Sequence, residues 1–558
     1  MNDGSSTQAA EDEVRRRFAD HGLSGLDLRI REYPEETIFI VRVADVEYDR
    51  AVLVGNELDR LLAAKGFSGF VTVRKKDSRD ITHLLQDVGV ADQKATDLAN
   101  LLEARSRTSE IQPSLTYIPD AANNLSAIVE ARHHLVFGRR GAGKTALLVE
   151  GKRVVEGQGH ATVWANIQTY RHEGSYRTFI WIAKAILDRL TVLSKSRSQQ
   201  LGAEIAGLDA EIDKALAQPA VEHQIAERLV PKLQRVVRRA VDTAACKLYI
   251  FLDDLHYVSR TDQPLLLDLV HGIVRDADAW LKIASIRHLS RWYQATPPLG
   301  LQSGHDAAHI DLDLTLESPT DAKRFLDAML DSYAAHVGLK SARSVFSEDA
   351  LNRLVLAAGA VPRDHLVLSA GAIRQAKRRA NARQAGVQDV NRSAGDQSKV
   401  KVAELEDDAA AEGAGKILEA LNTVRAFCLD DKKYTYCKVD FHDKETRPEE
   451  YALVQGLLDV RILHLISPSL SDKHQAGRRA EVFMLDLSQF SGQRLKKYLH
   501  VLDFVGGHIV LKRTSTTEPA KVGNTPRKLQ EILRRGPEFS LDRLSLGGAA
   551  VPDPFPGA

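Results

Sequence analysis

Cysteine is scarce in this chain of 558 residues: it occurs three times, as Cys246, Cys428 and Cys437. None of them has the CxxC spacing of zinc or redox motifs, so the sequence predicts neither a disulfide framework nor a zinc site. Long apolar runs are also missing, because no stretch approaches the roughly 18 residues that a membrane span needs. Residues 1–20 lack the apolar segment of a signal peptide. We therefore expect a cytoplasmic protein with no membrane partner.

An excess of either charge is absent as well. Lys and Arg number 76 against 75 Asp and Glu, a net charge of +1, so any nucleic-acid binding must rest on a local patch. The histidines do not gather at metal-ligand spacing, and no Ser/His/Asp or Cys/His set indicates nucleophilic catalysis. A length of 558 residues is too great for one hydrophobic core, so we expect three or more domains.

The most informative feature that is present is a glycine-rich loop with the pattern G-x-x-x-x-G-K-T. It follows the apolar run 134–137 and precedes the helix-prone run 146–149, which is the order strand, phosphate loop, helix of a nucleoside triphosphate site. Lys144 of such a loop reaches the β- and γ-phosphates, and the Thr145 hydroxyl binds Mg²⁺. The predicted nucleotide-binding residues are Gly138, Arg139, Arg140, Gly141, Ala142, Gly143, Lys144 and Thr145. The alternative is an ordinary glycine-rich turn.

Phosphoryl transfer also requires carboxylates that hold Mg²⁺ and orient a water molecule. The apolar run 248–252 ends in Asp253 and Asp254. At the carboxyl end of a buried strand, these two side chains would lie beside the phosphate loop. We therefore expect Asp253 to bind Mg²⁺ and Asp254 to polarise the attacking water. The alternative is a pair of solvated loop carboxylates.

Three arginines are further candidates. Arg287 closes the next predicted strand, where it would sense the γ-phosphate, although a surface arginine near a strand end fits the same pattern. Arg291 is a weaker candidate for a finger that completes a neighbouring subunit's site. In the segment 359–363, glycine and Pro362 break the helix, and Arg363 opens the next helix and would face a nucleotide from a lid. A plain helix–helix turn fits this segment equally well.

The apolar runs predict an α/β core. Residues 120–320 hold five strands that alternate with helices, interrupted by a helical insert over 177–242, which indicates a mostly parallel sheet covered on both faces. The last strand, 309–314, alternates apolar and acidic residues, so we place it at a sheet edge. Residues 321–392 are expected to be helical throughout and to form a lid.

The flanking regions predict smaller domains. Residues 1–110 are expected to form an α+β domain for regulation or interaction, with residues 1–9 disordered and 111–120 as a linker. A polar, alanine-rich stretch, 393–412, separates the helical region from a winged-helix-like domain at 414–513. Residues 514–558 carry Pro, Gly and Ser and are expected to be mostly disordered.

The sequence does not decide which kind of partner the predicted C-terminal domain binds. The loop of its wing is basic and suits phosphate contacts. The cations of this loop are Lys473, His474, Arg478 and Arg479. The helix before the wing instead carries Glu449, Glu450 and Asp459, which would repel a DNA duplex. DNA binding and protein or oligomer contact therefore both stay open for this domain.

A second basic region, 371–402, is either the solvated face of a lid helix or a DNA backbone contact. Its cations are Arg374, Lys377, Arg378, Arg379, Arg383, Arg392, Lys399 and Lys401.

The ordered set Gly138–Thr145, Leu248–Asp254, Ile283–Arg287 and Gly359–Arg363 resembles AAA+ and STAND-type P-loop ATPases, above all those of replication-origin recognition. The resemblance covers residues 120–390 and implies switch-like binding and hydrolysis of ATP with Mg²⁺, a helical lid and a winged helix. The residues that it assigns are Asn166 on the second strand, Asp253 and Asp254 in the Walker B element, Arg287 as sensor 1, and Arg363 as sensor 2 next to Pro362.

Two departures from the family pattern qualify this resemblance. Sensor 1 in many members is Asn, Ser or Thr, so Ser285 competes with Arg287 for that role. The Walker B element ends in Asp-Asp rather than Asp-Glu, which favours STAND switches with slow hydrolysis. Such switches often serve in bacterial anti-phage defence, a setting that the resemblance suggests at the level of the fold alone.

Three functions compete. The first is an ATP-dependent switch that controls a partner protein or nucleic acid and that oligomerises with ATP. The second is an ATP-gated initiator or loader on double-stranded DNA. The third is a scaffold that binds ATP and scarcely hydrolyses it.

Overall fold

The computed structural model describes residues 4–23, 27–32, 37–43, 47–67, 69–75, 89–110, 117–120, 122–194, 198–379, 381–408, 414–473, 475, 477–490, 498–505, 508–513 and 527–545. It divides into two compact units, Met1–Asp87 and Val88–Ala558, which are described separately. The expected basic wing residue His474 lies outside the described residues.

The small unit is a three-stranded sheet packed against helices. β1 (Asp27–Glu32) pairs antiparallel with β2 (Thr37–Val43), and β2 pairs parallel with β3 (Gly69–Lys75). The strands β2 and β3 are rich in β-branched residues, as expected for strands, whereas the sequence of β1, DLRIRE, is mostly charged.

Two helices complete the core of the small unit. They are α1 (Gly4–Asp20) and α2 (Tyr48–Ala64). Phe18 from α1 and Leu58 from α2 are buried with Phe39 of the sheet. The expectation of disorder over residues 1–9 is wrong from Gly4 onward, because α1 begins there and buries Ala10 and Val14.

The large unit contains a five-stranded sheet in the order β10-β4-β7-β6-β5, in which every neighbouring pair is parallel. The strands are β4 (His133–Phe137), β5 (Ala161–Asn166), β6 (Leu248–Asp253), β7 (Ala279–Ser285) and β10 (Ala307–Asp311). The three inner strands are almost wholly buried, and the partly acidic β10 lies at an edge. The predicted α/β fold class and the edge position of the last strand are confirmed.

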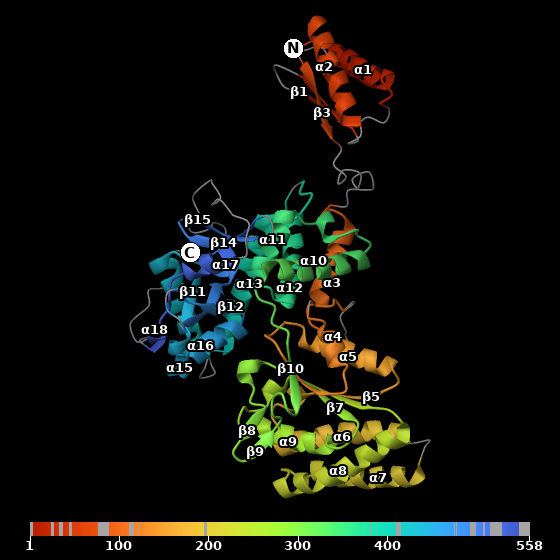
Figure 1. The fold of residues 1–558 in the computed structure, drawn as a ribbon, viewed down its shortest axis with the longest axis vertical. Helices are drawn as coiled ribbons and strands as arrows, with labels where there is room; N and C mark the ends of the chain where they lie inside the picture. The colour runs from red at the N-terminus through yellow and green to blue at the C-terminus, as the bar shows by residue number, and fades with distance from the viewer. Residues whose placement is uncertain are drawn as a thin grey trace. The chain divides into compact units, whose positions relative to one another are not determined.

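Helices cover both faces of this sheet. The first, α5 (Lys144–Gly157), follows the glycine-rich loop, and α6 and α9 pack with the α7–α8 pair in further layers (Figure 1). Their bounds are α6 (Ser175–Ser194), α7 (Gln199–Leu216), α8 (His223–Ala244) and α9 (Gln263–Val274). The predicted helical insert therefore corresponds to α6, α7 and α8. The short elements are α4 (Asn124–Ile128), β8 (Tyr293–Ala295) and β9 (Pro298–Gly300).

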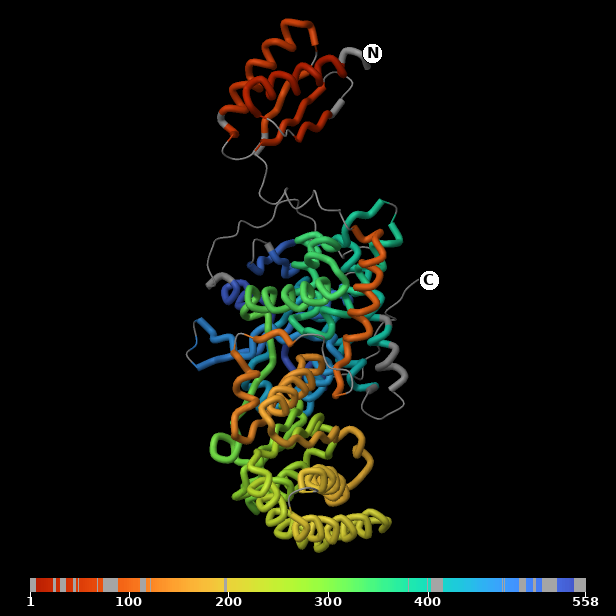
Figure 2. The backbone as a smooth tube through the Cα atoms, turned by 90° about the vertical axis from the view of Figure 1, so that its right-hand side faces the viewer, coloured from red at the N-terminus to blue at the C-terminus, as the bar shows by residue number. Residues whose placement is uncertain are grey.

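A group of helices follows the sheet. It consists of α10 (Pro319–His336), α11 (Glu348–Ala357) and α12 (Pro362–Lys377). An earlier helix, α3 (Gln93–Ala104), packs along α12 and α10 (Figure 2). The first compact unit accordingly ends at Asp87, whereas the sequence placed the end of the N-terminal domain near residue 110.

The expected polar spacer at 393–412 is instead largely helical. Helix α13 runs over Val387–Asp408 and packs closely on α12, where Ser393 lies against Gly371 and its hydroxyl donates to the Leu368 carbonyl at 3.1 Å. A Cβ on Gly371 would meet the Ser393 hydroxyl oxygen, so the glycine permits this close approach. Residues 409–413 lie outside the described residues.

The C-terminal domain is a winged-helix-like arrangement around an antiparallel sheet in the order β11-β13-β12. Its helices and the π-helical segment Ala426–Lys432 precede the hairpin β12–β13, and a second hairpin, β14–β15, follows. The bounds are α14 (Ala414–Arg425), β11 (Tyr436–Asp440), α15 (Phe441–Thr446), α16 (Pro448–Asp459), β12 (Leu463–Ser471), β13 (Arg479–Leu485), β14 (His500–Val505) and β15 (His508–Arg513).

The expected disordered tail is partly folded. Helices α17 (Arg527–Arg534) and α18 (Asp542–Ser545) pack on the C-terminal domain, and Phe539 and Leu541 between them are buried in its core. Backbone hydrogen bonds join this segment to Lys438 on β11, the edge strand of the sheet. Residues 514–526 and 546–558 lie outside the described residues.

Buried side chains divide the large unit into two bodies. The sheet body, residues 122–311, has its own hydrophobic clusters. The lid body, residues 93–104 and 319–545, holds two clusters that each span the lid helices and the C-terminal domain, and the larger runs from Leu98 and Ile373 into Phe483 and Phe539. Among the described residues, no helix is long and apolar enough to cross a membrane.

Candidate nucleotide site

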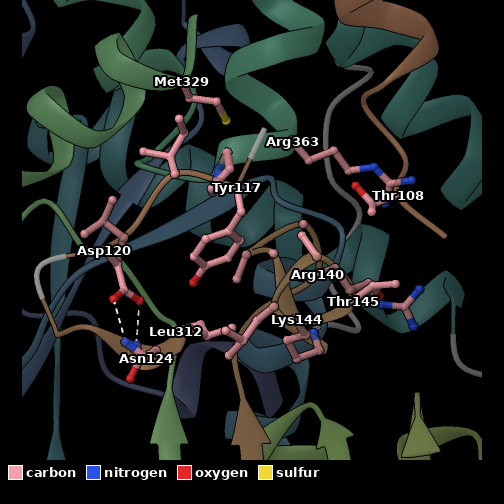
Figure 3. Close-up of a pocket in the computed structure, with 18 of the residues that line it drawn as sticks. Thr108, Tyr117, Asp120, Asn124, Arg140, Lys144, Thr145, Leu312, Met329 and Arg363 are labelled. Atoms are coloured by element: carbon pink, nitrogen blue, oxygen red, sulfur yellow. Dashed lines mark hydrogen bonds between the residues drawn. The ribbon is translucent and has the colours of Figure 1, made fainter. Parts of the chain in front are cut away.

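A cavity of about 1120 Å³ lies at the carboxyl end of the parallel sheet, between the sheet body and the lid body. The glycine-rich loop and the start of α5 form its floor, and helices α10 and α12 contribute to the opposite wall. The carboxyl edge of a parallel sheet is where such folds bind ligands. Figure 3 shows the lining side chains, among them Lys144, Thr145, Arg140 and Arg363.

The glycines of the loop have the conformations that a phosphate loop needs. Gly141 and Gly143 have φ of 84° and 102°, in the left-handed region that residues with a Cβ rarely adopt. Lys144 is buried, and its Nζ donates to the carbonyl oxygens of Gly138 at 2.8 Å and Arg139 at 3.1 Å. Burial lowers the pKa of Lys144, while Asp254 and Asp253 nearby raise it.

The two arginines of the loop point to different places. Arg140 lines the cavity. The Arg139 guanidinium instead donates to Asp313 at 3.2 Å and to the Leu314 carbonyl at 2.6 Å, and Asp313 also accepts from the Arg139 backbone N–H at 2.7 Å. Arg139 therefore anchors the loop to the segment after β10. Gly138 is held between Ala142 and Leu312, where a Cβ would be crowded.

Asp253 and Thr145 meet at the floor of the cavity. The Thr145 hydroxyl donates to Asp253 Oδ2 at 2.8 Å, and the buried Asp253 Oδ1 has no hydrogen-bond partner among the described residues. Burial and the neighbouring Asp254 raise the pKa of Asp253 to about 7, against the opposing hydrogen bond from Thr145. A hydroxyl beside an unpartnered carboxylate oxygen is a donor set that Mg²⁺ prefers, so these residues fit the ion.

Asp254 lies next to Asp253 with a strained backbone, because its φ of 62° is in the left-handed region. Its carboxylate lines the cavity. Burial raises its pKa, and the cations Lys144, Arg140 and Arg363 oppose that shift. His256 Nδ1 lies 3.9 Å from Asp254 Oδ1, and burial, with the nearby Lys144, Arg140 and His288, lowers the pKa of His256 to about 3. His256 is therefore neutral at pH 7.

The segment 359–363 brings the lid to the loop. The Arg363 backbone N–H donates to the Gly141 carbonyl at 3.3 Å, and a Cβ on Gly141 would lie 2.7 Å from Arg363 Cβ. Pro362 and Arg363 both line the cavity. Burial and the cations Arg461, Arg107 and Arg140 lower the pKa of Arg363, while the neighbouring Asp364 raises it, so positive charge gathers around Arg363.

The structure does not bring Arg287 into this cavity. Strand β7 ends at Ser285, two residues earlier than the predicted strand, and Arg287 lies in the turn beyond it. Its guanidinium lies 4.5 Å from the centre of the Phe137 ring and donates to Asp311 at 3.1 Å. Ser285 is buried and bonded to Ser290 at 2.5 Å. Arg287, Ser285 and Arg291 do not lie among the cavity-lining residues of the described chain.

Several lining residues were not predicted. Tyr117 and Asp120 belong to the stretch that the sequence assigned to a linker, and Figure 3 shows the Tyr117 ring between Met329 of the lid and Leu312 after β10. Asp120 accepts from the Asn124 backbone N–H at 2.9 Å and from its side chain at 2.6 Å, which fixes the turn before α4. The runs 105–110 and 117–120 before the sheet form this wall together with lid residues such as Met329, and no motif marks them in the sequence.

Several basic residues of the lid and wing are paired within the protein, whereas others, such as Arg392 and Arg479, are exposed. Arg374 pairs with Glu103, Arg379 pairs with Asp389 at 2.6 Å, and Lys401 pairs with Asp364 at 3.3 Å. Arg478 of the wing pairs at 2.6 Å with each of two carboxylates, on Asp440 and Glu538. Internal pairing therefore accounts for part of the region 371–402, and both interpretations of its exposed cations stay predictions.

The acidic helix before the wing is also covered by the chain's own C-terminal segment. Ser545 donates to Glu450 at 2.5 Å, and Arg447 pairs with Asp542 at 2.5 Å. Asp459 at the other end of α16 bonds His288 of the sheet body at 3.0 Å. Both ends of the helix that would enter a DNA groove therefore contact other parts of this protein.

Comparison with known proteins agrees with this site. Residues 122–275 match the family model of the AAA ATPase domain. The predicted resemblance to AAA+ P-loop ATPases is confirmed for this stretch, which contains the glycine-rich loop, Asp253 and Asp254. A comparison with curated proteins finds no match.

Solved structures of origin-recognition proteins are similar to this chain. The Aeropyrum pernix Orc1 protein in complex with DNA is 17% identical, with 66% of this chain and 90% of that chain covered and a TM-score of 0.33. Cdc6p from Pyrobaculum aerophilum is 13% identical, with coverage of 68% and 94% and a TM-score of 0.31. Drosophila ORC bound to DNA is 14% identical, with coverage of 63% and 87% and a TM-score of 0.27. We infer no function from these likenesses.

Proposed function

We propose that this protein is an ATP-dependent molecular switch that binds ATP with Mg²⁺ in the cavity, hydrolyses it slowly, and thereby controls a partner. The observation that carries the proposal is the convergence of Lys144, the Thr145–Asp253 pair and Arg363 on one cavity from two separate bodies. A nucleotide bound there would contact both bodies at once. Its presence or loss would therefore change how the two bodies meet.

The residues divide the work of binding. The backbone N–H groups of the loop and Lys144 would hold the phosphates, and Thr145 and Asp253 would hold Mg²⁺. The bound ion would neutralise charge on the phosphate oxygens. Arg140 and Arg363, which have no carboxylate partner among the described residues, would offset the remaining negative charge. Tyr117 and Met329 would pack against the adenine ring.

Asp254 is the residue that we assign to proton transfer. A water oxygen would attack the γ-phosphorus while the bond from the γ-phosphorus to the β–γ bridging oxygen breaks, giving ADP and phosphate, and the Asp254 carboxylate would take the water proton. Burial raises its pKa, which makes the carboxylate a stronger base. The shorter reach of Asp compared with Glu is consistent with slow turnover.

The switch would act on a partner. Because α16, Arg478 of the wing and Arg379 of the lid contact other parts of the chain, we favour a partner protein or a second copy of this chain over double-stranded DNA. An ATP-gated DNA initiator is therefore the less supported alternative. A cytoplasmic role in bacterial anti-phage defence stays a prediction of the family resemblance.

The site assignment is tested by calorimetric titration of the full chain with ATP and Mg²⁺. Replacing Lys144 by Ala should weaken binding by about 10- to 100-fold, because a hydrogen bond to a charged group contributes about 1.5–3 kcal/mol. Arg153→Ala is the control on the helix that follows the loop, since its guanidinium is exposed and pairs with Glu150. Unchanged ATP binding by Lys144→Ala, or equal losses in both variants, would contradict the assignment.

A further inference from the structure

A buried ionic network joins the segment 359–364 of the lid to the C-terminal domain. Asp364, the residue after Arg363, forms an ion pair with Arg461 at 3.0 Å and accepts from Lys401 of α13 at 3.3 Å. Lys401 also donates to Asp486 at 3.4 Å and to the Arg461 carbonyl at 3.0 Å. The side chains of Lys401, Asp364 and Asp486 are 11%, 8% and 5% exposed, so water screens these contacts little.

A second contact meets the same segment from the C-terminal domain. His464 of β12 is buried and bonds Asp486 through Nε2 at 2.8 Å. Its ring lies against Gly359, where a Cβ would come within 2.1 Å of His464 Nδ1. Gly359 is therefore required for the approach of His464 as well as for its φ of 55°. Gly359 and Asp364 of the segment 359–364 thus both contact the C-terminal domain.

The opposite side of this segment contacts the nucleotide cavity. Arg363 lines the cavity, and its backbone bonds Gly141 of the phosphate loop. A displacement of Arg363 must move Asp364, because the two are consecutive on the first turn of α12. Asp364 cannot move alone, since Lys401 and Arg461 would each lose a buried partner.

We propose that the network Asp364–Lys401–Asp486–His464 transmits the nucleotide state from Arg363 to the C-terminal domain, so that the lid and this domain move as one rigid body. This inference rests on the proposed function. Asp364 and Lys401 are positioning residues in this scheme, since neither needs to touch the nucleotide. The shared hydrophobic core that runs from α12 to β13 agrees with a single moving body.

Hydrogen–deuterium exchange on the full chain, with and without ATP and Mg²⁺, tests the proposal. In the wild type, ATP should slow exchange at the lid segment 359–366 and, in parallel, at 461–467 and 483–487 of the C-terminal domain. Lys401→Met should keep the ATP response at 359–366 and lose it at 461–467 and 483–487. A merely structural role for Lys401 would instead change exchange equally with and without ATP.

The matched control is Arg353→Met. Arg353 of α11 pairs with Asp503 of β14 at 3.4 Å, with side chains 12% and 17% exposed, so it also joins the lid to the C-terminal domain but lies outside the network. This variant should keep the full ATP response. If Lys401→Met does not fold, Asp486→Asn takes its place, because the amide keeps the shape and loses the charge that faces Lys401.

The outcomes separate the two proposals. If calorimetry shows that wild-type protein binds ATP but the segments 461–467 and 483–487 do not respond, the coupling is overturned and the proposed function stands. Retention of the C-terminal response in Lys401→Met would also overturn the coupling. If ATP does not bind at all, the proposed function fails, and the coupling fails with it.

Discussion

The large unit has two internal boundaries of opposite character. Between the lid helices and the C-terminal domain, buried hydrophobic side chains form two shared clusters, with an ionic network embedded beside them. Between the sheet body and the lid body, no hydrophobic cluster of the described residues is shared, and polar contacts there include those of His288 with Asp459 and of Arg363 with Gly141.

This difference indicates which boundary can open. Separating the lid from the C-terminal domain would expose apolar surface at about 25 cal/mol per Å², which makes that boundary a permanent one. Polar boundaries within a chain resemble transient interfaces and permit domain motion. The nucleotide cavity lies in the polar boundary. A ligand bound in this cavity would therefore act at the boundary that opens more easily.

We expect the largest effect from Phe539→Ala, which removes a side chain from the core that the lid helices share with the C-terminal domain. Phe539 is 1% exposed and lies 5.1 Å, ring centre to ring centre, from Phe427 in the shared core. The substitution should lower the stability of the lid body by about 3–5 kcal/mol. Differential scanning calorimetry with and without ATP should show an earlier transition for the lid body. A loss of less than about 1 kcal/mol in the free energy of unfolding would mean that the segment containing Phe539 is not part of this core.

A smaller effect is expected at the boundary between the sheet body and the lid body. Arg363→Met should weaken ATP binding by about 10- to 100-fold through the loss of a charged hydrogen-bond donor, and isothermal titration would measure it. Arg287→Met is the matched control, because Arg287 follows a neighbouring strand but contacts Phe137 and Asp311 instead of the cavity. A larger loss in Arg287→Met than in Arg363→Met would reverse the assignment of the two arginines.

The sequence could predict the floor of the site because its parts are local. Lys144 and Thr145 belong to one loop, and Asp253 and Asp254 end one apolar run, so motif and hydrophobic pattern suffice. The wall formed by Tyr117, Asp120 and Met329 could not be predicted, since these residues meet only through tertiary packing.

The same limit explains the errors elsewhere in the lid body. Helix α13 contains Gly395 and many polar residues, and its stability comes from packing on α12 that no local propensity reports. Phe539 and Leu541 lie in a stretch rich in turn-forming residues, and their burial depends on pairing with the edge strand β11. Arg287 was expected at the cavity because the end of β7 was placed two residues too late.

The most direct test of the central claim is the rate of phosphate release from ATP by wild-type protein and by Asp254→Asn. Asp311→Asn is the control, because Asp311 is a cavity-lining carboxylate that ends β10 and already pairs with Arg287. We predict that Asp254→Asn binds ATP but loses about 10²- to 10⁴-fold in turnover, as expected for a general base, while Asp311→Asn retains activity. Equal turnover in wild type and Asp254→Asn would contradict the account.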